Sequence, residues 1–257
     1  MTKTPDLVEM TPWNWNDIHG EDSIKILRQG KFACAMVADG VSLSAGGGNA
    51  SAFAADQVEK AFMARYGASD PVRADFESFV EDLLYLMESA SSHEVLRGSQ
   101  TTLSLAVIEE AVKEFDSRQY LLVDYFCSGD SPIVTCRKQQ LMAGLPDSFV
   151  CTAVHEAPLV VEQAGRLYSF FDATTGKFEG SSRVGRFYLE KGDTVLLMTD
   201  GVPYMPAIVR DVGDDKKFRF LNQIQNRKTA KAFDWLKNYV KDHPLSDDAS
   251  IITIHHR

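Results

Sequence analysis

Two runs of apolar residues each end in an Asp-Gly pair, and these runs constrain the fold more than any other feature of the chain. Phe32–Ala38 leads into Asp39-Gly40, and residues 194–199 lead into Asp200-Gly201. Both runs are apolar almost without interruption, as expected for strands that are covered on both faces. A carboxylate at the end of such a strand has poor access to water and needs a compensating partner. We therefore expect a β-rich core with acidic groups along one edge.

Other segments predict the remaining elements. Runs rich in β-branched and aromatic residues predict strands over 101–108, 120–127, 132–137 and 250–255. Apolar residues at helical spacing predict helices over 49–65, 75–96 and 229–241. This order lacks regular βαβ alternation, so an antiparallel α+β layered fold is favoured over a doubly wound sheet. No repeat or linker divides the chain, and we expect one domain over 1–257, with a flap-like stretch of mixed strand and loop within 141–191.

Composition excludes several classes of function. A net charge of -9 and a pI near 5.2 argue against nucleic acid or an anionic membrane surface as the main partner, but not against a site that concentrates metal cations. No window is long and apolar enough for a membrane span, and the polar N-terminus does not resemble a signal peptide. The four cysteines form no CxxC pair. Buried, reduced thiols are the simplest interpretation, and they favour a cytoplasmic location.

Two more acidic pairs flank predicted strands. Glu21-Asp22 precedes an apolar stretch at 24–26, and Asp247-Asp248 immediately precedes the last strand. Each pair alone is most simply a turn or a cap. Several strand ends that meet at one rim would instead form an all-oxygen site, which suits magnesium or manganese rather than zinc. Their joint occurrence indicates such a site.

The segment 38–51 (ADGVSLSAGGGNAS) resembles a signature of the metal-dependent protein phosphatases, the PPM family of type 2C serine/threonine phosphatases. There a strand ends in Asp-Gly, a loop of small residues follows, and Ala-Ser opens a helix. Further resemblances follow in the family's order, at 20–22 (GED), 98–106 (GSQTTLSLA), 128–131 (SGDS), 192–201 (GDTVLLMTDG) and 247–250 (DDAS). They extend over most of the chain, whose compact length resembles the bacterial members.

The resemblance implies a two-layer antiparallel β-sandwich with helices on both faces and with metals at one end. It implies that Asp39 and Asp200 are catalytic, and that Asp39 bridges two metal ions, one of which also binds the Gly40 carbonyl. Asp200 and Asp247 would complete the other ion. Glu21 and Asp22 would act mostly through metal-bound waters. Asp248 remains an alternative to Asp247, because the doublet leaves the register open by one residue.

The implied reaction is hydrolysis of phosphoserine or phosphothreonine in a protein by a hydroxide that two divalent ions, manganese or magnesium, activate. The partner would be a phosphorylated protein, and the enzyme would oppose a serine/threonine kinase. The alternative is a phosphatase-like regulatory or binding module with little or no activity. An aspartyl-phosphate enzyme is excluded, because Val37 and Met198 stand where its nucleophilic aspartate would have to be, two residues before the strand-end aspartates.

The chain departs from the family pattern at several positions. Asp17 stands where the family often has an arginine that grips the substrate phosphate, and Val41 stands where eukaryotic members have a histidine. His19 is a candidate replacement for that histidine. We interpret Asp130 as part of a turn between two antiparallel strands and do not assign it to a metal. Whether a third metal binds stays open at this point. The candidates to replace the arginine are Arg28, Arg183 and Arg186.

Overall fold

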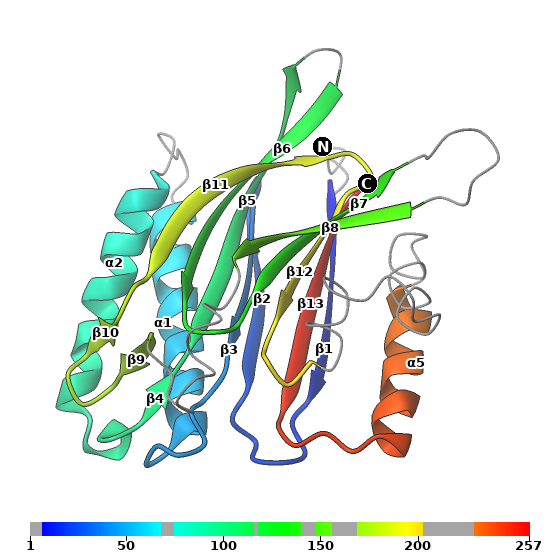
Figure 1. Ribbon diagram of the computed structural model, residues 1–257. Helices are drawn as coiled ribbons and strands as arrows, with labels where there is room; N and C mark the ends of the chain where they lie inside the picture. Colours follow the sequence, from blue (N-terminus) through cyan, green and yellow to red (C-terminus); the bar gives the residue numbers. More distant parts are fainter. Residues whose placement is uncertain (1–6, 68–74, 116–117, 140–147, 156–168, 203–228) are drawn as a thin grey trace.

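Two five-stranded antiparallel sheets pack face to face at the centre of the structure, a computed structural model that describes residues 7–67, 75–115, 118–139, 148–155, 169–202 and 229–257 (Figure 1). The first sheet has the spatial order β1 (Val8–Trp15), β13 (Ala249–His256), β12 (Thr194–Met198), β7 (Ile133–Gln139) and β8 (Ser148–His155). The second has the order β11 (Arg183–Glu190), β6 (Arg118–Ser128), β5 (Leu103–Phe115), β3 (Phe32–Ala38) and β2 (Ser23–Gln29).

Strand β3 shows why the central strands have continuously apolar sequences. Ala33, Ala35 and Val37 pack into the core between the two sheets. Cys34 and Met36 point to the opposite face and pack into a second core beneath helices. All five side chains are fully buried, because successive residues of a strand face opposite sides and both sides of β3 are covered.

Helices cover the outer face of each sheet (Figure 1). Helices α1 (Gly47–Tyr66) and α2 (Phe76–Glu88) lie on the second sheet, together with a small sheet of β10 (Lys177–Glu179), β9 (Phe170–Asp172) and β4 (Gln100–Thr101). Helix α5 (Thr229–Asp242) lies on the first sheet. The predicted α+β sandwich with helices on both faces is therefore confirmed. None of the helices in the described residues is long and apolar enough to cross a membrane.

Two of the predicted elements are divided differently in the structure. The predicted strand 101–108 becomes β4 and β5, which are separated at Thr102, where the chain binds the backbone of Asp39. The predicted helix 75–96 ends at Glu88 and continues as two 3₁₀ turns, η1 (Ser89–Ser92) and η2 (Glu94–Leu96). The Ser89 hydroxyl donates to the Leu86 carbonyl at 2.6 Å, and such local bonds compete with a regular helix.

The described residues of the flap-like stretch 141–191 form strands and the turns between them, in line with the expected mixture of strand and loop. It includes β8, β9 and β10, and its residues 183–190 form β11. Residues 141–147 and 156–168 of that stretch lie outside the described residues, so the structure does not test the prediction there.

Candidate metal centre

Five aspartates from five different connections gather at one end of the sandwich. The connections from β1 to β2 and from α5 to β13 lie at the lower end in Figure 1. Strand β2 begins at this end where β3 ends, since Ser23 pairs with Ala38. Strand β13 begins where β12 ends, since Met198 pairs with Ile251. The connections that leave and enter these strands therefore meet here. The five aspartates are Asp22, Asp39, Asp130, Asp200 and Asp247.

Asp39 lies at the centre of this group. Burial raises the pKa of Asp39 well above its ordinary value, and the nearby charges of Asp22 and Asp200 raise it further. Its backbone is fixed on both sides: the Asp39 carbonyl accepts from the Thr102 N–H at 2.8 Å, and the Asp39 N–H donates to Thr102 Oγ1 at 3.1 Å. These two hydrogen bonds fix the backbone of Asp39, so its carboxyl stays close to the other acids.

Asp22 is the most buried of the five, with 5% of its surface exposed. Thr199, next to Asp200, donates its hydroxyl to Asp22 Oδ2 at 2.9 Å, which joins the two sheets at this point. Among the described residues, nothing donates a hydrogen bond to the buried Oδ1 atom. Burial raises the pKa of Asp22 to about 7. A buried carboxylate oxygen without a donor has the environment expected of an atom that faces a cation.

Asp247 and Asp248 have different surroundings although they are adjacent. The Asp248 carboxylate is buried and accepts from the backbone N–H groups of Ile18 (2.9 Å), His19 (3.2 Å) and Glu21 (2.9 Å). Asp247 is partly exposed and acts on the pKa values of Asp130 and Asp200. These surroundings favour Asp247 over Asp248 as the candidate metal ligand. The Asp248 carboxylate is already bound by backbone N–H groups, whereas Asp247 faces the other acids.

Asp200 is the most exposed member of the group. Protein atoms around its carboxyl still raise the pKa of Asp200 by desolvation, and the charge of Asp247 raises it further. Asp200 follows the fully buried strand β12, so its position is set by the core, whereas its carboxyl reaches the rim. It is therefore the aspartate of this group that a solvent-borne ligand reaches most easily.

Glu21 lies beside the aspartates and contacts Ser42 and His19. Its carboxylate accepts from the Ser42 hydroxyl at 2.5 Å, and His19 Nδ1 lies 3.2 Å from the same hydroxyl. His19 Nδ1 is also 3.4 Å from Asp247 Oδ1. The ligand atoms of His19, Asp247 and Asp248 all lie within 4.8 Å of one another. Since the Asp248 carboxylate already accepts from backbone donors, Asp247 is the acid of this trio whose carboxylate is better placed to bind a cation.

Gly40 is buried at the point where the β3 strand meets helix α1. A Cβ atom at Gly40 would lie 2.3 Å from the carbonyl carbon of Gly47, the first residue of α1. The Gly40 N–H donates to the Glu21 carbonyl at 3.2 Å, which ties the predicted acidic pair to the Asp-Gly turn. Glycine is required here for close backbone approach.

The sequence interpretation of Asp130 is wrong in one respect and incomplete in another. Asp130 does not join two paired strands, because β6 belongs to the second sheet and β7 to the first. The connection crosses between the sheets and brings Asp130 to the acidic group. Burial raises the pKa of Asp130 to about 6, and the charges of Asp200 and Asp247 add to the rise. A change of sheet at this turn is what the sequence did not reveal.

The donor set fits hard divalent cations. Its members are carboxylate oxygens, with a buried Asp22 oxygen that has no donor and a glycine that allows close approach of the backbone. Magnesium and manganese prefer oxygen ligands of this kind. Without positive charge, burial disfavours the ionised form of these acids and their neighbouring negative charges disfavour it further, which together raise their pKa values. The residues present therefore fit the two-ion centre that the resemblance implies.

Only one of the three arginines considered as a replacement at position 17 lies near this end. Arg28 binds Glu110 and the Val8 carbonyl, and Arg186 binds Asp124, all towards the opposite end. Arg183 pairs in register with Cys127, one residue before the end of β6. Ser169 Oγ donates to the Ser181 carbonyl at 3.1 Å and lies 2.8 Å from Ser128 Oγ, so the start of β11 is held beside the connection that carries Asp130.

Comparison with known proteins agrees with this geometry. A family model described as protein phosphatase 2C matches residues 15–241. No curated protein sequence is significantly similar to the chain. Among solved structures, the serine/threonine phosphatase PstP/Ppp of Mycobacterium tuberculosis superposes with a TM-score of 0.59 at 17% identity, covering 96% of this chain and 98% of that one.

Two other solved structures have the same fold. The catalytic domain of the phosphatase PstP in complex with two manganese ions gives a TM-score of 0.61 at 17% identity, with 96% of this chain and 97% of that chain covered. A bacterial serine phosphatase gives a TM-score of 0.65 at 15% identity, with coverage of 97% and 98%. At these identities the likeness establishes the fold.

Proposed function

This chain belongs to the protein phosphatase 2C family, and from that premise we propose that it is a metal-dependent phosphatase acting on phosphoserine and phosphothreonine in proteins. The observation that carries the proposal is the acidic group around Asp39, where the strand ends of both sheets converge. We propose that residues 1–257 act as one phosphatase domain. The substrate would be a protein that a serine/threonine kinase has phosphorylated.

We assign two divalent ions, manganese or magnesium, to the acidic group. Asp39 would bridge them, since its carboxyl interacts with both Asp22 and Asp200. Asp200, Asp247 and the Gly40 carbonyl would supply further oxygen ligands. When bound, such ions supply a water acidic enough to attack phosphorus at neutral pH and positive charge for the phosphoryl oxygens. The two manganese ions in the PstP complex support this assignment by analogy.

The remaining residues hold these groups in place. Thr199 orients Asp22 by donating to Oδ2, and its Oγ1 accepts from the Ser250 N–H at 2.8 Å. Asp248 fixes the backbone around Glu21, so that the turn carrying Glu21 and Asp22 is held in place. The N-terminus of the 20-residue helix α1 packs against Gly40, and this end of a helix favours negative charge nearby. These contacts thus hold the carboxylates of the acidic group in position for the metal ions.

The cysteines agree with a reducing compartment. Cys34 and Cys127 are free thiols, and both are buried, as is Cys136, in the described part of the chain. On that ground we propose a cytoplasmic location.

The decisive experiment is hydrolysis of a phosphothreonine peptide and of a small aryl phosphate with manganese, with magnesium and with chelator. We expect activity that requires metal and that falls by at least about 10²-fold in Asp39→Asn and Asp200→Asn. Asp234→Asn, an exposed change on α5, is the matched control and should retain activity. Activity that survives chelator would contradict the metal mechanism. Metal binding without hydrolysis of any substrate would instead support a regulatory module.

A further inference from the structure

A pocket of about 270 Å³ lies far from the acidic group, between the second sheet and the ends of α1 and α2 that are remote from it. Phe32, the first residue of β3, lines the pocket, whereas Asp39 follows the last residue of the same strand. At about 3.3 Å per residue, β3 places the two sites roughly 20 Å apart. A ligand in this pocket would therefore not occupy the proposed metal centre.

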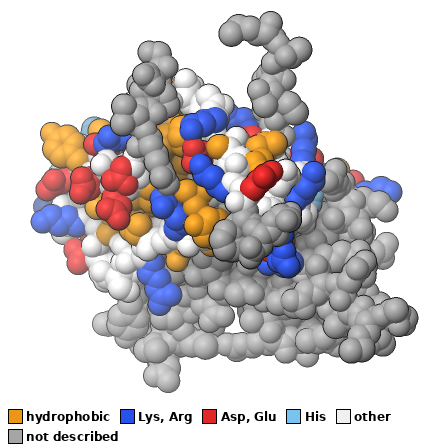
Figure 2. Space-filling view, turned by 90° about the horizontal axis from the view of Figure 1, so that it is seen from above, with side chains coloured by type: hydrophobic (Ala, Val, Ile, Leu, Met, Phe, Trp, Pro, Cys, Tyr) orange, Lys and Arg blue, Asp and Glu red, His pale blue; other side chains and the backbone are white. Residues whose placement is uncertain are grey.

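The pocket combines aromatic walls with acidic side chains. Phe32 and Tyr66 pack with their ring centroids 4.6 Å apart, and both line it. Three carboxylates line it, those of Asp75, Glu109 and Asp124, against a single arginine. That arginine, Arg186, forms a two-point ion pair with Asp124, and Lys31 and Lys113 lie against Glu109, so Asp75 is the lining carboxylate without an ion pair among the described residues. Figure 2 looks onto this end of the molecule, where acidic side chains lie beside hydrophobic surface at the left.

The chain itself shows which chemistry this lining accepts. The ammonium group of Lys31 lies 2.6 Å from Glu109 Oε1 and 5.3 Å from the centroid of the Phe32 ring. Glu109 and Phe32 both belong to the pocket. One corner of the pocket thus already binds an ammonium group between a carboxylate and an aromatic face, the arrangement by which proteins recognise organic cations.

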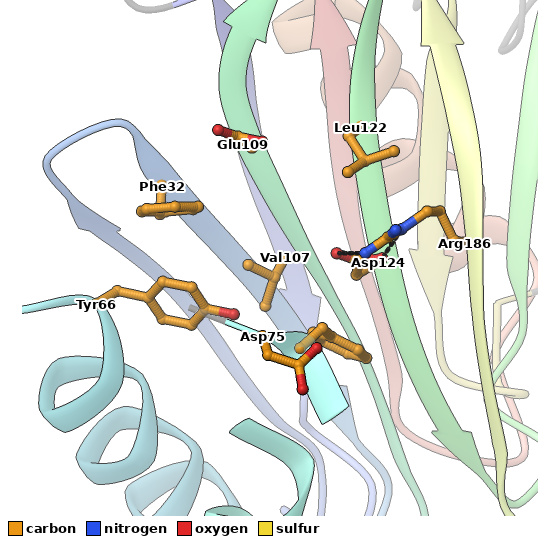
Figure 3. Close-up of a pocket in the computed structure, with 9 residues that line it drawn as sticks. Phe32, Tyr66, Asp75, Val107, Glu109, Leu122, Asp124 and Arg186 are labelled. Atoms are coloured by element: carbon orange, nitrogen blue, oxygen red, sulfur yellow. Dashed lines mark hydrogen bonds and ion pairs between the residues drawn. The ribbon is translucent and has the colours of Figure 1, made fainter. Parts of the chain in front are cut away.

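A second aromatic and carboxylate pair in the pocket, Tyr66 and Asp75, can still accept hydrogen bonds. Tyr66 is 3% exposed, and its ring points into the pocket with the hydroxyl directed between Val107 and Asp75 (Figure 3). No described residue forms a hydrogen bond with that hydroxyl. The Asp75 carboxylate accepts only a long bond, 3.3 Å, from Ser78 Oγ among the described residues. The hydroxyl of the buried Tyr66 and the exposed Asp75 carboxylate thus face the same space, and no described side chain donates a hydrogen bond to both.

We propose that this pocket binds a small organic ammonium ion, with the charged nitrogen held by Tyr66 Oη and Asp75 and the apolar body against Phe32 and Tyr66. An ammonium has three donors and no acceptor, which matches two acceptors that lack partners. Because Glu109 and Asp124 are paired with basic side chains, the remaining charge of Asp75 favours a cation over an anion or a neutral molecule. The site is separate from the phosphatase chemistry and does not depend on it.

The test uses phenethylammonium and two molecules of the same size, neutral 2-phenylethanol and anionic phenylacetate. Binding to the full chain is followed by NMR shift changes and by calorimetry at neutral pH. We expect saturable binding of the ammonium alone. The Tyr66→Phe and Asp75→Asn variants should each weaken it by about fivefold or more, whereas Glu81→Gln, which removes a negative charge from an exposed position of α2 outside the pocket, should not.

Equal binding of 2-phenylethanol would overturn the proposal, as would equal losses in the Glu81→Gln control. Tyr66→Phe keeps the ring and removes only a hydroxyl without a partner, so it remains informative if Asp75→Asn disturbs the start of α2. Because the measurement is binding without turnover, its failure and a failure of the phosphatase proposal are distinguishable.

Discussion

The carboxylate of Asp248 accepts a hydrogen bond from the backbone N–H of Glu21 at 2.9 Å, although the two residues lie 227 positions apart. The same carboxylate accepts from Ile18 and His19, so one buried side chain holds the whole turn before β2. This turn carries the predicted acidic pair. The contact therefore links the end of the chain to the geometry of the candidate metal centre near its beginning.

Replacing Asp248 by alanine should destabilise the fold, because three backbone donors lose their acceptor at about 1 kcal/mol or more each. We expect a loss of about 3 kcal/mol in urea unfolding with chelator present, and a smaller loss in Asp248→Asn, which keeps one oxygen. Asp247→Ala is the matched neighbour: it should leave unfolding nearly unchanged and weaken manganese binding. Equal effects of the two alanine variants on stability would contradict the division of roles.

The metal-free protein should become less stable as the pH rises from about 4 to about 7. Burial raises the pKa of Asp22 from 3.8 to about 7, so the folded state binds a proton more tightly than the unfolded state does. The stability from this group is complete below the unfolded pKa and is lost as the pH passes through the folded pKa. Asp130, with its pKa raised to about 6, acts in the same direction.

This dependence can be measured as the melting temperature in chelator across that pH range. Asp22→Asn should flatten the curve and raise the melting temperature at the alkaline end, whereas Asp234→Asn on the exposed face of α5 should not. Saturating manganese should oppose the loss, because the ion favours the deprotonated acids. A metal-free curve that rises with pH through this window would show that the acids are not mutually repelling.

Gly40→Ala should destabilise the protein by about 2 kcal/mol or more, since the new Cβ would lie 2.3 Å from a backbone carbon of Gly47. Gly46→Ala is the control in the same loop. Its Cβ would meet side-chain atoms first, at 3.0 Å from Asn49 Nδ2, and these can shift. Thermal unfolding of both variants provides the comparison. A Gly46→Ala loss as large as that of Gly40→Ala would remove the argument for close backbone approach.

The sequence predicted those strands whose residues are nearly all buried, because full burial leaves a continuous apolar run. The six strands recognised in advance include β3, β12 and β13, which are central strands covered on both faces and hence continuously apolar. Of the edge strands of the two five-stranded sheets, β1 and β2 were not predicted, and β8 and β11 fell within 141–191, which was predicted only as mixed strand and loop. An edge strand has fewer buried positions, as the alternating exposure of β11 shows, so its sequence resembles that of a loop.

The same reasoning explains the candidate site. Asp39, Asp200, Asp22 and Asp247 were predicted because each adjoins a recognisable strand, or precedes one in a motif pair. Asp130 was interpreted as a simple turn residue, because only tertiary structure reveals that β6 and β7 belong to different sheets. The distinction between Asp247 and Asp248 likewise depends on which backbone donors are nearby, and these come from residues 18–21.

Arg183 should contribute to the binding of a phosphorylated peptide. It is exposed at the start of β11, which Ser169 and Ser128 hold beside the connection that carries Asp130. A positive charge at this end would offset the acidic surroundings when a phosphate group approaches. We expect Arg183→Ala to raise the KM for a phosphothreonine peptide by about fivefold, with a smaller change in kcat. Arg186→Ala lies three positions along the same strand and loses its pair with Asp124, but should keep a normal KM. Equal KM values in the two variants would place phosphate binding on the metal ions alone.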